Sequence, residues 1–277
     1  MSKETAPIKW HGGKNAFNGK LAKWIVSLMP EHVHYVEPYA GGLAVLLNKD
    51  PEGVSEVVND LHRGLTTFWR VLGNRRAFEF MQQRLLMTPF SEPEFEQSKA
   101  RLESELAGQF EPDVAADFFI VCRQSRQGLM KDFATMSQNR VRRGMNEQVS
   151  SWLSAIEGLS EIHERLRRVV VFQRDALDVI RSQDGPNTLF YVDCPYLPET
   201  RSTKTDYQFE MNEAQHKELL GVLANLRGKF ILSGYRSPLY NAAESAYGWR
   251  SAEFQIPNNA SSRKTKDRKT EVVWMNY

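Results

Sequence analysis

The chain has 277 residues, a formal net charge of +2 and 41% hydrophobic residues. This length accommodates one large α/β domain, or a core domain with a smaller inserted domain, and the hydrophobic content excludes a disordered chain. No stretch approaches the roughly 20 apolar residues of a transmembrane helix, and the first five residues lead into no apolar signal segment. We therefore expect a cytoplasmic protein without a membrane partner.

The two cysteines, Cys122 and Cys194, have no CxxC or metal-type partner near them in the sequence. Two reduced thiols are therefore expected, rather than a disulfide or a metal site. The small net charge says little about an anionic partner, but the distribution of charge along the chain says more.

The first 60 residues predict the beginning of a nucleotide-binding βαβ unit. A basic loop with two glycines, residues 7–14, precedes a helix-periodic segment at 17–29. Residues 34–37 predict a strand, which leads into a turn of small residues at 38–42 and a helix at 43–48.

A second strand is predicted at residues 54–58, and it ends at Asn59 and Asp60. An acid at the end of the second strand, about 20 residues beyond the glycine turn, is where ribose hydroxyls are usually held. The turn and the acid together predict a nucleoside site.

The middle of the chain is helical in pattern. Apolar residues recur at three- and four-residue spacing at 61–72, 77–86, 94–106, 114–126 and 147–166. A helical block of this length is too large for a crossover between two strands. We predict an inserted all-α domain over residues 61–166, between the two segments of a catalytic domain, 1–60 and 167–277.

Charge is segregated within this insert. Residues 91–113 are acidic, whereas residues 122–145 are basic and contain the single acid Asp132. The basic side chains of the second segment are those of Arg123, Arg126, Lys131, Arg140, Arg142 and Arg143. Such a run is either a solvated helix face or a nucleic-acid contact.

Strand character returns after the insert. Strands are predicted at 168–172, 189–192, 229–233, 252–256 and 271–275, with helices at 177–182 and 213–226. The predicted fold is therefore α/β: a seven-stranded Rossmann-like sheet with the helical domain inserted between its second and third strands. A second basic patch contains Arg263, Lys264, Lys266, Arg268 and Lys269. A phosphate-binding segment and a plain surface loop are equal alternatives for it.

The strand at 189–192 stops at Asp193, Cys194, Pro195 and Tyr196. Pro195 has no N–H and cannot continue a ladder, so the chain must turn here. In an open α/β sheet, ligands bind outside the carboxyl ends of the strands. The Asp193 carboxylate and the Cys194 carbonyl are two acceptors beside the Tyr196 ring, which suits a planar group that carries an NH2. A strand end with an ordinary turn is the alternative.

Three predicted turns lie at the carboxyl ends of parallel strands: residues 37–42, Asp60 and residues 193–196. They should therefore share one edge of the sheet. No GxxxxGK[ST] sequence is present, which disfavours phosphate chemistry. An NAD enzyme would fit the first two turns, but the third points away from it.

The order of these motifs resembles that of the Dam-type (D12 class) DNA adenine-N6 methyltransferases. The motifs are, in chain order, the loop at 9–14, the turn at 37–42, Asn59 with Asp60, the helical insert and the turn at 193–196. The resemblance covers nearly the whole chain. It implies a Rossmann-like methyltransferase sheet, S-adenosylmethionine as cofactor, and double-stranded DNA as substrate, with target recognition in the insert. We expect a site-specific enzyme of a bacterial or phage-infected cell that methylates a flipped adenine and has no obligate protein partner.

The resemblance also assigns residues. The cofactor would contact Trp10, Lys14, Glu37, Tyr39, Gly41, Asp60 and Asp193. The reacting amine would lie against Asp193, Cys194, Pro195 and Tyr196. DNA would contact the basic residues of the insert, from Arg123 to Arg143. No metal is required.

Two residues depart from the family pattern. Cys194 stands where the family usually has the first proline of Asp-Pro-Pro-Tyr, so the carbonyl remains but the turn loses rigidity, and a reduced rate is expected. Leu43 stands where a second glycine of the cofactor loop is common. A cytosine-C5 nucleophile role for Cys194 is disfavoured because the Asp-x-Pro-Tyr context serves amines. Cytosine-N4 or RNA adenine methylation, or DNA binding with weak catalysis, remains the alternative function.

Two further expectations concern the residues after the predicted strands. The segment 198–209 directly follows the predicted turn and would be a lid over the flipped base, or a segment without function. Asp175 would border the adenine of the cofactor.

Overall fold

The computed structural model describes residues 6–10, 12–104, 108–200, 209–256 and 269–277. It divides into two compact units, each made of three separate chain segments. The first unit contains Met1–Val26, Gly41–Asp50 and His62–Gln173, and the second contains Ser27–Ala40, Pro51–Leu61 and Arg174–Tyr277.

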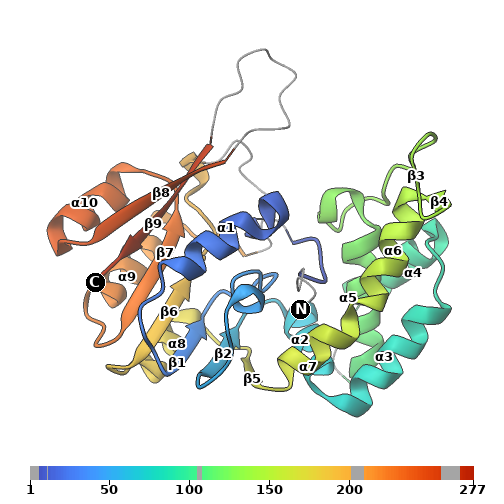
Figure 1. Cartoon of the computed structure of the whole chain (residues 1–277), viewed down its shortest axis with the longest axis horizontal. Coiled ribbons are helices and arrows are strands. Elements are labelled where there is room, and N and C mark those ends of the chain that lie inside the picture. Colours follow the sequence, from blue (N-terminus) through green and yellow to red (C-terminus); the bar gives the residue numbers. More distant parts are fainter. Residues whose placement is uncertain (1–5, 11, 105–107, 201–208, 257–268) are drawn as a thin grey trace. The chain divides into compact units, whose positions relative to one another are not determined.

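A seven-stranded, mainly parallel sheet has the strand order β5-β2-β1-β6-β7-β9-β8 (Figure 1). The strands are β1 (His34–Glu37), β2 (Ser55–Asn59), β5 (Val169–Phe172), β6 (Thr188–Val192), β7 (Lys229–Gly234), β8 (Arg250–Ile256) and β9 (Lys269–Met275). Strand β1 pairs in parallel with β2 and β6, and β6 with β7, whereas β9 runs antiparallel to both β7 and β8. The prediction of a seven-stranded α/β sheet is confirmed.

Strand β6 lies in the middle of the sheet, between β1 and β7. All five of its residues are buried, which explains why its sequence is a continuous apolar run rather than an alternating one. Phe190 pairs with Val36 of β1 on one side and with Phe230 of β7 on the other. The turn at Asp193 therefore leaves the sheet at its centre.

Helices α8 (Ala176–Gln183), α9 (Glu213–Ala224) and α10 (Pro238–Tyr247) form a layer of the second unit (Figure 1). An ion pair joins Arg181 of α8 to Glu218 of α9 (3.1 Å), and His216 of α9 hydrogen bonds to Tyr240 of α10 (2.9 Å). The Tyr240 ring lies 4.9 Å from that of Trp274 in β9, so this layer covers one face of the sheet. The short 3-10 helix η3 (Pro198–Thr200) follows β6.

Helix α10 was not predicted, although its boundary signals are present in the sequence. Ser237 caps it by accepting from the Tyr240 N–H (3.2 Å), and Pro238 follows at a position that favours proline. The helix ends at Gly248, whose φ of 66° is the left-handed conformation of a glycine C-cap.

The first unit is helical. Its helices are α1 (Ala16–Ser27, whose last residue belongs to the second unit), η1 (Leu46–Asn48), α2 (Arg63–Gly73), α3 (Arg75–Met87), α4 (Glu92–Glu103), α5 (Glu111–Gln124), η2 (Arg126–Gly128), α6 (Glu147–Glu157) and α7 (Leu159–Leu166). Helix α5 lies at its core and packs against α2, α3 and α4. Phe119 of α5 lies 5.6 Å from Phe68 of α2 and 5.5 Å from Trp152 of α6, measured between ring centroids.

Two local predictions for this unit were wrong, and one element was missed. Residues 43–48 form a turn with one 3-10 turn, η1, rather than an α-helix. The predicted helix 147–166 is divided into α6 and α7 at Gly158. The hairpin of β3 (Val141–Arg142) and β4 (Met145–Asn146) was missed because its strands are only two residues long.

In the described part of the chain, no helix combines the length and the apolar character that crossing a membrane requires. Most of the predicted lid at 198–209 falls outside the described residues. The same is true of the side chains of the second basic patch, from Arg263 to Lys269.

Candidate functional site

The second unit brings the ends of β1, β2 and β6 to one edge of the sheet, because these strands are parallel. Asn59, the last residue of β2, fixes the adjoining loops. Its side-chain amide donates to the carbonyls of Pro38 (2.9 Å) and Arg174 (3.0 Å), and its side-chain oxygen accepts from the Arg174 N–H (2.9 Å). Asp60, the next residue, is half-buried at this edge. This role of Asn59 was not predicted from the sequence.

Glu37 is the last residue of β1, and Tyr39 lies in the turn that follows. The Glu37 carboxylate is buried and accepts a hydrogen bond from the Tyr35 hydroxyl (2.7 Å). Burial raises the pKa of the Tyr39 phenol, and the nearby Cys194, Asp175 and Glu218 raise it further. Tyr39 therefore remains a neutral hydrogen-bond donor near neutral pH.

Asp193 and Tyr196 interact directly. The Tyr196 hydroxyl lies 3.2 Å from Oδ1 of Asp193 and also donates a short hydrogen bond to Oε1 of Glu271 in β9. The Tyr196 ring is 8% exposed, and the Tyr235 ring, 5.0 Å away, meets it edge to face. Burial raises the pKa of Tyr196, as do the neighbouring Asp193 and Glu271. Glu271 and Tyr235 were not predicted as site residues.

Cys194 and Pro195 lie between them. Cys194 is buried, with Sγ 3.8 Å from the hydroxyl oxygen of Tyr240 in α10, so its thiol packs against the helical layer. Pro195 is half-buried. The Asp175 carboxylate caps α8 by accepting from the N–H groups of Leu177 (2.8 Å) and Asp178 (3.3 Å).

Trp10, Lys14 and Gly41 belong to the first unit. Gly41 has a φ of 48°, and a Cβ added to it would lie 3.0 Å from the Trp10 ring, so only glycine fits without displacing that ring. The ring also lies 5.6 Å from His62. Lys14 is buried, and its Nζ donates to the Gly12 carbonyl (3.2 Å).

Leu43 follows these glycines with a φ of 56° and a side chain that is 1% exposed. A leucine in the left-handed region is strained. The conformation is the one that a glycine would adopt freely, at the position where the resemblance leads one to expect glycine.

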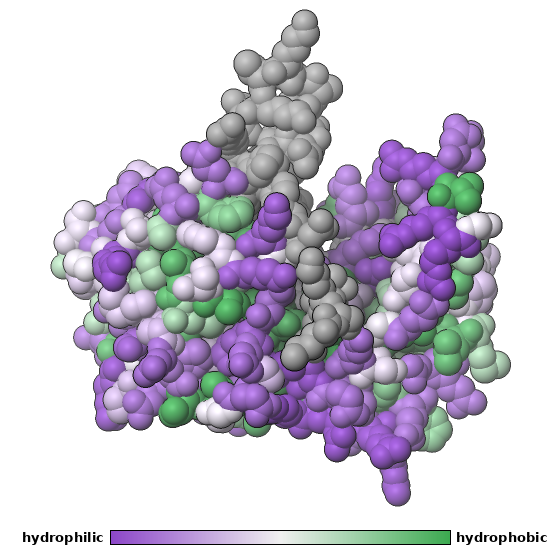
Figure 2. All heavy atoms as spheres, in the orientation of Figure 1, coloured by the Kyte–Doolittle hydropathy of each residue, from purple (hydrophilic) through white to green (hydrophobic). Residues whose placement is uncertain are grey.

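Five of the six basic residues predicted to contact DNA are exposed: Arg126, Lys131, Arg140, Arg142 and Arg143. Hydrophilic side chains cover most of the surface around the β3–β4 hairpin (Figure 2). Arg140 pairs with Glu147 (3.3 Å), and Arg143, in the hairpin turn, pairs with Glu157 (3.0 Å).

Arg123, the sixth basic residue, differs from the others. Its guanidinium donates to the carbonyl and the hydroxyl of Ser151 (both 3.1 Å), and burial lowers its pKa to about 10. The side chain of Arg123 is therefore half-buried, with its guanidinium held against Ser151 of α6.

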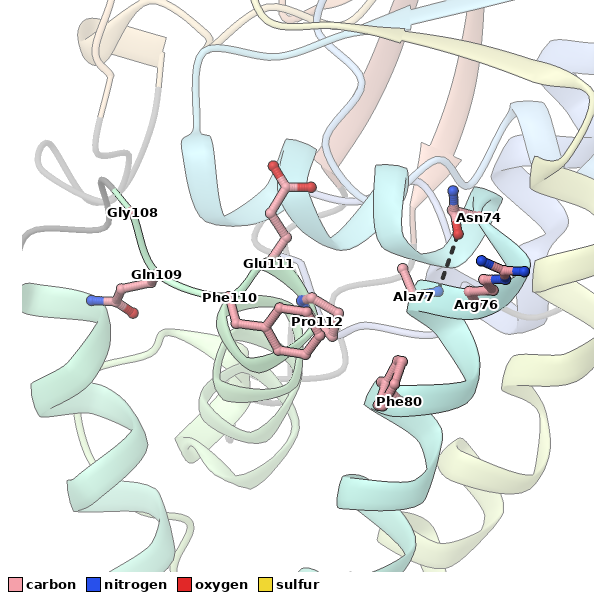
Figure 3. A pocket seen from close by; sticks show the side chains of 9 residues that line it. All are labelled: Asn74, Arg76, Ala77, Phe80, Gly108, Gln109, Phe110, Glu111 and Pro112. Atoms are coloured by element: carbon pink, nitrogen blue, oxygen red, sulfur yellow. Dashed lines mark hydrogen bonds between the residues drawn. The ribbon is translucent and has the colours of Figure 1, made fainter.

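An open pocket of about 570 Å³ lies between the start of α3 and the start of α5 in the first unit (Figure 3). The exposed rings of Phe80 and Phe110 meet there edge to face, with centroids 5.7 Å apart. None of the predicted site residues lines this pocket. Across the described ranges, no cluster of three or more potential metal-ligating side chains is present.

The family model described as D12 class N6 adenine-specific DNA methyltransferase matches residues 10–264, nearly the whole chain. No curated protein matches the sequence.

Proposed function

Because this chain belongs to the family of D12 class N6 adenine-specific DNA methyltransferases, we propose that it transfers a methyl group from S-adenosylmethionine to the exocyclic amine of adenine in double-stranded DNA. The observation that carries the proposal is the turn after β6, where Asp193 lies beside Tyr196 at the centre of the sheet edge. We propose that this edge is the active site.

The residues at the edge suit an exocyclic amine. The lone pair of such an amine is delocalised into the ring, so the amine is a poor nucleophile. Two acceptors, the Asp193 carboxylate and the Cys194 carbonyl, would hold its two N–H bonds and draw the nitrogen towards a tetrahedral geometry. The ring of Tyr196 would lie against the base.

The same residues suit the cofactor. Its ribose hydroxyls and its ammonium group are hydrogen-bond donors, and Asp60, Glu37 and Asp193 offer carboxylate oxygens. Tyr39, in the same unit, would lie beside these carboxylates. In the first unit, the family resemblance assigns cofactor contacts to Trp10, Lys14 and Gly41. When bound, S-adenosylmethionine supplies an activated methyl group, so the protein acts mainly by positioning two groups in line.

We assign DNA recognition to the helical part of the chain and to its exposed basic residues. The amine of a paired adenine lies inside the duplex, so the base must leave the stack, at a cost of a few kcal/mol. Contacts of Arg126, Lys131, Arg140, Arg142 and Arg143 with backbone phosphates would offset this cost. Arg123, half-buried against Ser151, would support this surface.

The test is a transfer assay with labelled S-adenosylmethionine and unmethylated duplex DNA, followed by digestion to nucleosides. Labelled N6-methyladenine is the expected product. Labelled N4-methylcytosine would show that the enzyme methylates the exocyclic amine of cytosine. Label in RNA alone would show that RNA, and not DNA, is the substrate. DNA binding without any label would refute catalysis.

The assignment of Asp193 is tested by Asp193→Ala, with Asp178→Ala, an exposed aspartate of α8, as the control. We expect the first variant to lose methyl transfer and to keep DNA binding, and the second to behave as the unmodified protein. Full activity in Asp193→Ala would refute the role of this carboxylate.

A further inference from the structure

Glu271 is a buried carboxylate at the edge of the sheet where the strand ends meet. Strand β9 runs antiparallel to β7, and its pairing with β7 extends to Val272 opposite Gly234. Glu271 therefore lies at the start of β9, on the edge where the parallel strands β6 and β7 end. Its side chain is 2% exposed.

The Tyr196 hydroxyl faces two carboxyl groups. It donates a short hydrogen bond to Oε1 of Glu271 and lies 3.2 Å from Oδ1 of Asp193. A phenol has one proton, so it can donate to only one of the two oxygens at a time. When Tyr196 donates to Glu271, its oxygen is turned towards Asp193 as an acceptor, and a proton on Asp193 would complete the chain.

This inference rests on the proposed function, because methyl transfer releases a proton. The bond between N6 and the methyl carbon forms while the bond between that carbon and the sulfur of the donor breaks. The electron pair of the broken carbon–sulfur bond stays on the sulfur. The methylated nitrogen then carries one proton too many. Neutral N6-methyladenine forms only when a base removes it.

We propose that Asp193, Tyr196 and Glu271 form a proton-transfer chain in which Glu271 is the final acceptor. The proton passes from N6 to Oδ1 of Asp193 and from there to the Tyr196 oxygen, while the Tyr196 hydroxyl proton passes to Glu271. Asp193 and Tyr196 end unchanged, and Glu271 ends as a neutral carboxylic acid. Glu271 acts through Tyr196 and does not touch the base.

The surroundings fit this assignment. Burial disfavours a charged carboxylate, so taking up a proton relieves the desolvation of Glu271. The raised pKa of Tyr196 keeps the phenol protonated, as a relay requires. Tyr35 and Glu37 make a similar buried pair on β1, with a hydrogen bond of 2.7 Å.

Glu271→Gln tests the chain, since glutamine keeps the size and the hydrogen bond to Tyr196 but cannot accept a proton. We expect the single-turnover rate of methyl transfer to fall by about 10²–10⁴-fold, the range of general acid–base effects, with unchanged affinities for DNA and S-adenosylmethionine. The double variant with Tyr196→Phe should be no slower than the slower single variant, because both break one chain.

Glu56→Gln is the matched control: Glu56 is a buried carboxylate of β2 that is also 2% exposed. It should leave the rate unchanged. A second readout is the infrared absorption of a protonated carboxylic acid after one turnover, which Glu271→Gln should abolish.

Three outcomes are distinguishable. If the unmodified protein transfers no label to adenine, the proposed function fails. If it does, and Glu271→Gln matches its rate or the two substitutions act multiplicatively, only the proton-transfer chain is overturned. If Glu271→Gln does not fold, Tyr196→Phe is the test. A rate of methyl transfer equal to that of the unmodified protein refutes the chain. A lower rate at unchanged ligand affinity, together with loss of the carboxylic acid absorption, supports it.

Discussion

Cys194 interrupts the usual proline pair of the family with a residue whose thiol is buried against Tyr240. In the proposed reaction the useful group of this residue is its backbone carbonyl, which any side chain leaves in place. The side chain matters only for the rigidity of the turn, because a proline fixes its own φ and restricts the residue before it.

Cys194→Ser should therefore keep the rate of methyl transfer within about threefold, which is less than 1 kcal/mol of barrier. Cys194→Pro should increase the rate, provided that the loss of the contact with Tyr240 does not unfold the turn. Both are measured by single-turnover kinetics beside thermal unfolding. A loss of several orders of magnitude in Cys194→Ser would instead indicate a nucleophilic thiol.

Leu43 combines full burial with a left-handed backbone, and these two properties act in opposite directions on stability. Replacing it with glycine removes buried apolar surface but relieves the backbone strain. Leu46, in η1 of the same loop, is equally buried but lies in a helical turn.

We expect Leu43→Gly to destabilise the protein by about 1–2 kcal/mol less than Leu46→Gly, because a left-handed leucine costs about that much. Urea denaturation of the two variants measures the difference. Equal losses of unfolding free energy would show that the conformation at Leu43 carries no strain.

Among the elements, α5 is held to α3 and α4 by one buried carboxylate. Asp117 of α5 is 1% exposed and accepts hydrogen bonds from Arg101 of α4 (2.7 and 2.8 Å) and a short one from Arg84 of α3. The two-pronged contact with Arg101 raises the pKa of that guanidinium. Asp113, one turn earlier on α5, pairs with the same Arg84 (3.0 Å) but is exposed.

Asp117→Asn should lower the unfolding free energy by about 2–4 kcal/mol, less than for a fully buried pair because both arginines reach solvent. Asp113→Asn, the control, should change it by no more than about 0.5 kcal/mol. Urea denaturation again measures both. Comparable effects of the two substitutions would contradict the distinction by burial.

Prediction from sequence succeeded for elements whose signal is local. The apolar run of β6 and its polar end predicted a buried parallel strand and a turn, and the glycines at 41 and 42 predicted a turn of small residues. The short hairpin β3–β4 could not be predicted in this way, because a strand of two residues shows no periodicity.

Contacts between residues that lie far apart in the sequence could not be predicted. Tyr196 and Glu271 are 75 residues apart and meet because β9 inserts antiparallel beside β7. Asn59 and Arg174 are 115 residues apart. Arg123 looked like its basic neighbours in sequence, yet it lies on the side of α5 that faces Ser151.

At the scale of the whole molecule, a net charge of only +2 means that DNA affinity must come from a local surface. Arg140, just before β3, and Arg142, the last residue of β3, are exposed, and we propose that they contact phosphates. Arg75 and Arg76, at the start of α3, are also exposed and provide a control with the same change in charge.

The double variant Arg140→Gln with Arg142→Gln should weaken DNA binding and reduce the slope of log K against log[salt] by about 1.8, if each arginine contacts one phosphate. The double variant Arg75→Gln with Arg76→Gln should leave the slope almost unchanged. Fluorescence anisotropy over a range of salt concentrations measures both slopes. Equal changes would mean that the effect comes from net charge and not from a defined surface.

The two units are built from alternating segments of the chain, and this affects how the protein folds during its synthesis on the ribosome. Strand β1 needs β6 as its neighbour, but β6 leaves the ribosome about 150 residues later, which is about 8–30 s at ordinary elongation rates. During this interval the nascent β1 exposes an open apolar margin. Chaperone demand in the cell should therefore peak before translation reaches Val192.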